Sequence, residues 1–422
     1  MTGARRAVFV CCDGLGRDWI RPETTPVLDR LRRRSLWCAD HAAVFPSVTR
    51  VSAASVATGC HPSRHGLHGN RMALREEGGF IVRDVGQPDF RDHMRRATGG
   101  TLLTPTLAER AADAGGFIAF SNVSPGAAYF LDPDNHGWVY HRAGSWAPGG
   151  EAVPSSDVLA VSHDAAGDWA MTQRFCDEVL RRRRPAVALL WLCDPDHTLH
   201  GVPLGSPAHA DALRGAERCV AEVAGTVDAL RQKGEEILLM VGSDHGQETI
   251  GGSVNIGRWL AEQGLGGMLA AGDVAVAGQG TAAVLYATER GRAPLLGVIE
   301  AMREEAWTAD IEIGEALLRR GFAPHGGVVA AVNMGRSADA NPYGVPGRRW
   351  VVEEDGKPVP VGSGQHGGWG PDETRPFLMI DAADGGAGGL LERSSSLVDI
   401  APTIARFLGL PLDGFDGAPL VG

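Results

Sequence analysis

Carboxylate and imidazole side chains, the groups that bind divalent cations and move protons, follow several apolar runs of this sequence. Such mixed ligand sets suit zinc and, less selectively, manganese or iron. An apolar run that could form a buried strand and that ends on adjacent Asp and His residues therefore suggests a metal site. The segments are VFVCCDG, LLWLCDPDHTLHG, MVGSDHG and GQHGG, and they carry Asp13, Asp194, Asp196, His197, His200, Asp244, His245 and His366.

Any one of these aspartates has a plainer interpretation, because a single Asp after a strand is commonly a helix cap. Their joint occurrence is harder to explain in that way. In open α/β sheets, ligands bind outside the carboxyl ends of the strands. We therefore expect the four segments to converge on one rim. A turn that begins at Gly242 would free both Asp244 and His245 to face the same cation.

The stretch FPSVTRVSAASVATG, residues 45–59, supplies a candidate nucleophile. Pro46 and Ser47 break the preceding segment, and the small residues that follow predict a helix. Thr49 lies at its N-terminal end, where free backbone N–H groups and the helix dipole favour an anion. Thr49 is also an ordinary helix cap by type, and the two roles are compatible. A hydroxyl at this position can meet a phosphate and a metal.

The elements that must position these side chains alternate along the chain as short apolar runs and helix-like segments. This pattern is typical of a parallel sheet covered on both faces. We predict an α/β fold with a doubly wound, mostly parallel sheet sandwiched by helices. The predicted strands are 7–12, 117–121, 186–193 and 237–243, and the predicted helices are 25–34, 104–115, 169–184, 209–234 and a closing helix within 395–409.

The pattern changes from about residue 272 to residue 350. Strand-like GDVAVAGQGTAAVLYAT is followed by helix-like LLGVIEAMREEAW and then by strand-like GGVVAAVNMG. A unit of this kind inside an α/β frame predicts an inserted α+β cap subdomain. We therefore assign residues 1–271 and 351–422 to the catalytic core and residues 272–350 to the insertion.

Composition bounds the remaining classes of function. The chain has 422 residues, 44% of them hydrophobic, and a net charge of −11 without a large Lys/Arg cluster, which disfavours a nucleic-acid polymer as partner. No apolar stretch reaches the ~18 residues of a membrane span. The seven cysteines show no paired zinc-type spacing and indicate reduced core residues of a cytoplasmic protein. Oligomerisation stays open.

Taken in order, these motifs resemble the alkaline phosphatase superfamily, most closely its nucleotide pyrophosphatase/phosphodiesterase and phosphonoacetate hydrolase branch. The resemblance covers most of the chain. It implies an alkaline phosphatase-like core and two zinc ions, with small phosphate esters or phosphonates as substrates. The motifs are Asp13, FPSVT, ATG, HPSRHG, Gly69–Asn70, Asp196-x-x-x-His200, SDHG, GQHGG and the closing DIAPTIARFLG.

The resemblance also implies a role for each matching residue. Asp196, His200 and His366 would hold one ion, and Asp13, Asp244 and His245 would hold the other. Thr49 would be the nucleophile and a ligand of the second ion, and Asn70 would hydrogen-bond a phosphoryl oxygen. Asp194 and His197 do not match positions of the family motif, so we interpret them as supporting or structural residues.

One motif suggests a different enzyme class, the sulfatases. CHPSR, residues 60–64, spells the C-x-P-x-R pattern of sulfatases in the same superfamily. In a sulfatase, that cysteine opens the helix that ends in Thr-Gly. Here Thr58–Gly59 precedes Cys60, and Thr49 occupies the opening position. The sequence therefore disfavours a sulfatase.

The substrate is less well specified than the chemistry. We predict a phosphodiesterase acting on nucleotide-type substrates through a phosphothreonine intermediate, with a phosphonate hydrolase or a phosphomonoesterase as alternatives. Phosphonoacetate hydrolases are expected to hold a carboxylate with lysines, but this chain has only Lys233 and Lys357. Arg50 could bind the additional negative charge of a phosphomonoester, or it could simply be a solvated residue of the first helical turn. An aromatic group could line a leaving-group pocket or pack on the core: Tyr129, Phe130, Trp138, Tyr140 and Trp146.

Two other classes are weighed against an esterase. A catalytically silent metal-binding protein would keep the ligands, but the accompanying nucleophile argues against it. A zinc peptidase of the common type would need an H-E-x-x-H helix, and the sequence contains none.

Overall fold

The computed structural model describes residues 5–354, 358–382 and 388–421. An eight-stranded mixed sheet is its largest unit, and β18 runs antiparallel to both of its neighbours while the other pairs are parallel. From edge to edge the strands are β19 (Gly389–Leu390), β2 (Leu36–Trp37), β18 (Leu378–Asp381), β9 (Ile237–Gly242), β1 (Arg6–Cys12), β8 (Val187–Leu192), β6 (Phe117–Ser121) and β7 (Trp138–His141).

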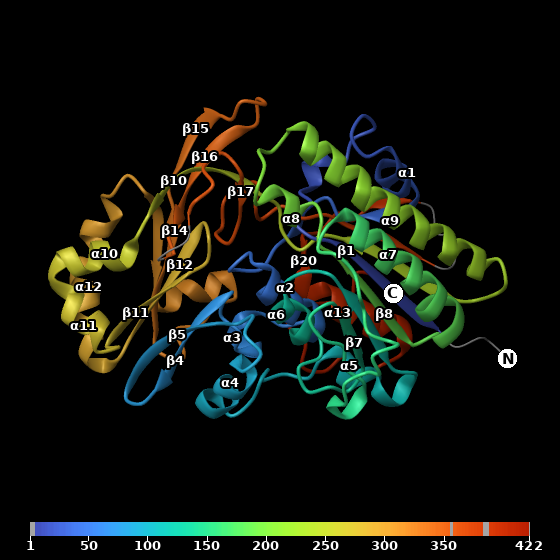
Figure 1. Ribbon diagram of the computed structural model, residues 1–422, viewed down its shortest axis with the longest axis horizontal. Coiled ribbons are helices and arrows are strands. Elements are labelled where there is room, and N and C mark those ends of the chain that lie inside the picture. Colours follow the sequence, from blue (N-terminus) through green and yellow to red (C-terminus); the bar gives the residue numbers. More distant parts are fainter. Residues whose placement is uncertain (1–4, 355–357, 383–387, 422) are drawn as a thin grey trace.

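Helices cover both faces of this sheet (Figure 1). The central strands β1, β8 and β9 are buried along their whole length, as expected where neither face meets water. Alternate residues therefore enter two separate cores, with Phe9 in one and Val10 in the other. The first face is covered by α2 (Thr49–Thr58), α5 (Leu107–Ala111), α6 (Pro125–Phe130) and α13 (Ile400–Leu408), and the second by α1 (Pro26–Arg34), α7 (Ala165–Arg174), the π-helix η4 (Phe175–Arg183) and α9 (Pro207–Arg231).

A second lobe lies beside this sandwich, on the left in Figure 1. One of its sheets is antiparallel and has the order β11 (Val274–Gly278), β12 (Ala282–Ala287), β14 (Val328–Met334) and β13 (Thr308–Ile313). The other has the order β15 (Arg336–Ala340), β16 (Pro346–Val352), β10 (Glu248–Val254) and β17 (Gly364–Gln365). The helices of the lobe are α10 (Ile256–Leu260), the π-helix η5 (Ala261–Leu265), α11 (Gly266–Ala270), α12 (Glu289–Arg303) and the 3-10 helix η6 (Gly314–Arg320).

The connections between the two lobes pass through the candidate site. The chain leaves β9, passes Asp244 and His245, and enters β10. It returns through β17, and His366 follows directly. Shorter elements of the fold include the hairpin β4 (Arg71–Glu76) and β5 (Gly79–Asp84), the pair β3 (His41–Ala42) and β20 (Ser395–Ser396), and the helices α3 (Pro62–His65), α4 (Phe90–Thr98) and α8 (Asp196–Leu199).

The predicted α/β fold class is confirmed, since a large mixed sheet is flanked by helices. The assignment of residues 272–350 as an inserted cap stays a prediction. Trp259 of α10, which precedes residue 272, shares a hydrophobic cluster with Val274 and Leu295 of the lobe. Among the described residues, no helix is both long and apolar enough to cross a membrane.

Candidate active site

Asp13 and Asp244 lie side by side because of strand register. In the parallel pair of β1 and β9, Cys11 is opposite Gly242, and each aspartate comes two residues later. Both carboxylates are buried. His245, also buried, places Nε2 3.4 Å from Asp13 Oδ1 and 3.2 Å from Asp244 Oδ2. The ends of two neighbouring strands thus form one compact group of three potential ligands.

Asp196, His200 and His366 form a second group beside the first. Asp196 opens the short helix α8 after β8, and its Oδ2 lies 3.2 Å from Nε2 of His200, one helical turn away. His366 reaches the same carboxylate from the loop after β17, with Nε2 3.3 Å from Oδ1. Asp196, His245 and His366 together have ligand atoms within 4.8 Å of one another. His200 is outside this set of three but contacts it through Asp196 and through the ring of His366, whose centroid is 5.4 Å from that of His200.

The electrostatics of these residues fit divalent cations. Burial raises the pKa of Asp13 well above its ordinary value, and the negative charges of Asp244 and Asp196 raise it further. Burial likewise raises the pKa of Asp244 to about 7. Asp244 Oδ2 is buried with no hydrogen-bond donor directed at it. Three carboxylates packed this closely repel one another unless positive charge lies between them.

In the second group, the histidines stabilise the ionised form of the carboxylate. Burial acts to raise the pKa of Asp196, but the charges of His200 and His366 and their hydrogen bonds hold it well below its ordinary value. For His366, burial acts to lower the pKa, but the hydrogen bond and charge of Asp196 raise it. The pKa of His245 lies well below its ordinary value because of burial and of His366.

Supporting residues orient the potential ligands, and sequence reasoning missed them. Nδ1 of His366 donates to the carbonyl of Ser47 (2.7 Å), which leaves Nε2 for a cation. Trp191 Nε1 donates to Asp13 Oδ2 (3.1 Å), and Gln247 Nε2 donates to Asp196 Oδ1. The strand alternation of β8 could have assigned Trp191 to the face of Cys11, its partner in register. For Ser47 and Gln247 the only signal was proximity to Thr49 and His245.

Thr49 begins helix α2, as the sequence predicted. Its hydroxyl Oγ1 is 3.3 Å from Nε2 of His245 and 3.5 Å from Oδ1 of Asp13. The side chain is only 6% exposed, so the hydroxyl is directed into the metal-type group rather than into solvent. A group at this position meets both the helix N-terminus and the carboxylate cluster.

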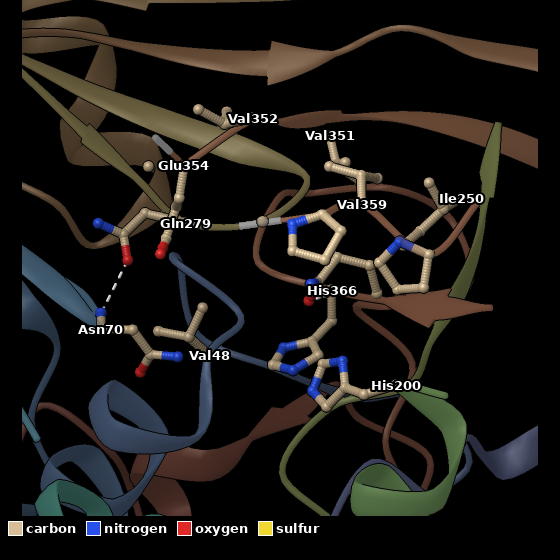
Figure 2. A pocket seen from close by; sticks show the side chains of 15 residues that line it. Val48, Asn70, His200, Ile250, Gln279, Val351, Val352, Glu354, Val359 and His366 are labelled. Carbon is tan, nitrogen blue, oxygen red and sulfur yellow. Dashed lines mark hydrogen bonds between the residues drawn. The ribbon is translucent and has the colours of Figure 1, made fainter. Parts of the chain in front are cut away.

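Asn70 lines a pocket of about 440 Å³ that opens beside His200 and His366 (Figure 2). Asn70 Oδ1 is buried with no hydrogen-bond partner. Aliphatic side chains form much of the opposite wall, among them Ile250, Val351 and Val359. The pocket therefore combines an apolar wall with the polar side chains of Asn70, His200 and His366.

The remaining candidates lie elsewhere or act as supports. Asp194 Oδ1 accepts the N–H of Thr198, and the exposed His197 packs on His163. Arg50 donates to the carbonyl of Asn70 (2.7 Å) and forms an ion pair with Asp84, so its guanidinium holds protein groups.

Cys60 of the sulfatase-like motif follows α2, at the end of the helix remote from Thr49. Its buried thiol donates to the carbonyl of Gly414. The helix has ten residues, so about 15 Å separates its two ends. This placement agrees with the rejection of a sulfatase site.

The aromatic group and the lysines do not form the described part of the pocket. Phe130 and Tyr140 are core residues, and Trp138 stacks on Tyr140. None of the five aromatics is among the described residues that line the pocket. Lys233 is exposed at the amino end of β9, about 20 Å from the carboxyl end that bears Asp244. Lys357 lies outside the described residues.

Solved structures of similar fold include two kinds of enzyme. Murine ectonucleotide pyrophosphatase/phosphodiesterase 5, as an inactive variant in complex with AMP, is 15% identical, with a TM-score of 0.70 over 98% of this chain and 97% of that one. Phosphonoacetate hydrolase from Sinorhizobium meliloti 1021, in complex with phosphonoformate, is 16% identical, with a TM-score of 0.68 over 96% of each chain. At such identities the likeness establishes the fold alone.

Comparison with curated protein sequences gives no match. The family model described as type I phosphodiesterase/nucleotide pyrophosphatase matches residues 7–328, which is well over half of the chain. The chain therefore belongs to the family of type I phosphodiesterases and nucleotide pyrophosphatases, which are phosphoester hydrolases.

Proposed function

We propose that this protein is a two-metal phosphodiesterase whose nucleophile is Thr49. The observation that carries the proposal is the position of the Thr49 hydroxyl. It lies at the first residue of a ten-residue helix and within 3.3 Å of His245 and 3.5 Å of Asp13. A threonine hydroxyl is a poor nucleophile at neutral pH unless its surroundings favour the ionised form.

The proposed ligands divide into two sets. Asp13, Asp244 and His245, with Thr49, would hold one zinc ion, and Asp196, His200 and His366 would hold the other. The unpartnered Asp244 oxygen and the mutual repulsion of the buried carboxylates support this assignment, and manganese or iron would suit the same ligands. When bound, such ions supply positive charge that lowers the pKa of a hydroxyl and neutralises phosphoryl oxygens.

The residues of the chain would then act in two steps. Thr49 Oγ, after its proton has passed to water, attacks phosphorus, and the bond from phosphorus to the leaving oxygen breaks. The leaving group takes up a proton from water, and the phosphothreonine that forms still carries the second ester group of the diester. Water then attacks the same phosphorus, which breaks the bond to Thr49 and restores its hydroxyl. In both steps, the N–H groups at the start of α2 and the amide of Asn70 would hold negative charge on the non-bridging oxygens.

The pocket beside the site supports a diester over the alternatives. Its volume of about 440 Å³ leaves room for a substantial leaving group next to His200 and His366. No lysine or arginine occurs among the described residues that line it, so those residues offer no cationic side chain to a carboxylate such as that of phosphonoacetate. A phosphonate hydrolase stays the second candidate, because phosphonoacetate hydrolase shares the fold.

A substrate panel tests this order of preference. Bis-p-nitrophenyl phosphate, p-nitrophenyl phosphate and phosphonoacetate are compared by kcat/KM with the zinc-loaded and the manganese-loaded enzyme. We expect the diester to be the best substrate. Preference for the monoester, or hydrolysis of phosphonoacetate alone, would overturn the proposed function. Dependence of phosphonoacetate hydrolysis on Lys357 would identify the missing cation.

A further inference from the structure

The turn between β11 and β12 reaches across from the second lobe and contacts the candidate site. Gln279 is the first residue of this turn and is 2% exposed. Figure 2 shows its side chain directed at the segment that carries Asn70. Such a contact between lobes concerns catalysis only if it controls the position of a group that touches the substrate.

The Gln279 amide holds the backbone on both sides of Asn70. Its Oε1 accepts the N–H of Asn70 at 2.7 Å, and its Nε2 donates to the carbonyl of Arg71 at 2.6 Å. Because a carbonyl only accepts and an N–H only donates, these partners fix the orientation of the amide. Arg50 binds the carbonyl of Asn70 from the other side, at 2.7 Å. The backbone of Asn70 is thus fixed at both its donor and its acceptor.

The fit between Gln279 and the Asn70 segment is close. A Cβ added at Gly69 would lie 2.3 Å from atoms of the Gln279 amide, so no larger residue fits there without a shift. The turn itself is also fixed, because Thr281 donates its N–H to the carbonyl of His366 at 3.2 Å. The same three-residue turn therefore contacts the segments of Asn70 and of a proposed metal ligand.

We propose that Gln279 is a positioning residue. By holding the backbone of Asn70, it keeps the side-chain amide of Asn70 within hydrogen-bonding reach of the phosphoryl group of the substrate. The inference rests on the role proposed for Asn70 in binding a phosphoryl oxygen. Gln279 need not touch the substrate to act. Its contribution to the rate passes through Asn70, since misplacement of a charge-stabilising donor by a fraction of an ångström weakens its effect in the transition state.

A double-mutant cycle tests this coupling. Gln279→Leu removes the hydrogen bonds of the amide to Asn70 and Arg71 and should lower kcat/KM for bis-p-nitrophenyl phosphate roughly tenfold, about the effect of one lost hydrogen bond. In the Asn70→Ala background, the same change should lower kcat/KM by less than about twofold. Gln232→Leu, on the exposed end of α9, is the matched control and should keep wild-type activity.

The outcomes separate this inference from the proposed function. Equal losses of kcat/KM from Gln279→Leu in both backgrounds would show that Gln279 acts independently of Asn70. That result would contradict this inference and leave the proposed function standing. Wild-type activity of Asn70→Ala would remove Asn70 from phosphoryl binding, and the inference would fall with it. Thermal unfolding and metal content are measured for every protein. If Gln279→Leu does not fold, Gln279→Glu, which keeps the acceptor but loses the donors, completes the cycle.

Discussion

The imidazole rings of His245 and His366 stack on each other, with centroids 3.6 Å apart and planes inclined by 14°. They come from different connections between the lobes, one before β10 and the other after β17. Their Nε2 atoms approach different carboxylates, those of Asp13 and Asp244 for His245 and that of Asp196 for His366. The stacked pair thus lies between the two proposed ligand sets, and several expectations depend on this arrangement.

Removal of Thr49 should stop turnover without emptying the site. We expect Thr49→Ala to lower kcat for a diester by roughly 10³-fold or more, since the hydroxyl proposed as the nucleophile is lost. Bound metal, measured by elemental analysis, should stay at the wild-type level, because carboxylate and imidazole ligands remain. Thr49→Ser keeps a hydroxyl and should retain part of the activity. Near-wild-type turnover of Thr49→Ala would exclude Thr49 as nucleophile.

Removal of the cations should affect both activity and stability. Treatment with a chelator should abolish hydrolysis and lower the midpoint of thermal unfolding, because a ligand that binds only the folded state stabilises it. Zinc or manganese should restore both properties. Asp244→Asn should bind one ion fewer per chain than the wild type. An enzyme that keeps full activity after exhaustive chelation would contradict the two-metal site.

Close packing around His366 predicts that Gly367 tolerates no side chain. Gly367 has φ +131°, and an added Cβ would lie 1.5 Å from the carbonyl oxygen of Gln279. Gly367→Ala should displace the His366 loop and lower kcat/KM roughly 100-fold, with a loss of bound metal. Gly99→Ala is the control, since Gly99 has φ +90° with no atom within 4 Å of an added Cβ. That variant should lose only about 1 kcal/mol of stability.

The buried, neutral side chain of His65 should make the stability of the fold sensitive to acid. Burial lowers the pKa of His65 from 6.5 to about 3. Its Nδ1 accepts the N–H of Leu67, a bond that protonation would break. Because the pKa is lower in the folded state, the contribution to stability is fully present above pH 6.5 and is lost as the pH falls toward 3.

Substitution of His65 isolates this effect. Asn can accept the same N–H without titrating, so His65→Asn should weaken the pH dependence of the unfolding free energy between pH 6 and 4. The slope should fall by about 1.4 kcal/mol per pH unit, the value for one proton. Urea unfolding at several pH values measures it. Identical slopes for the variant and the wild type would show that His65 is not the responsible group.

The central strands and their terminal aspartates were predictable because burial on both faces leaves near-continuous apolar runs. The predicted strand 117–121 and β6 coincide. Helices were predicted less well at their ends. The segment 104–115 forms only α5 and a 3-10 turn, and 169–184 begins earlier, at Ala165, and continues as a π-helix. Helix ends depend on tertiary packing, which apolar periodicity does not encode.

The contacts made by side chains across the two lobes were not predictable. Gln279 lies in a segment that showed only strand alternation, and nothing in its neighbourhood marks it as a partner of Asn70. The same holds for the aliphatic wall of the pocket, where Ile250 comes from strand β10 and Val359 from the segment before β17. A single sequence shows which residue types follow a strand, but it does not show which distant segment will face them.

The pairing of β1 with β9 has a consequence for when the proposed metal ligands come together. Gly14 and Asp244, which are joined by a hydrogen bond at this junction, are 230 positions apart in the sequence. Contacts of such long separation form late, because the intervening polypeptide must first be ordered. During synthesis, the first aspartate leaves the ribosome long before its companion. The proposed ligands Asp13 and Asp244 therefore meet late in maturation, and a cation held by both would be bound only after the central sheet has formed.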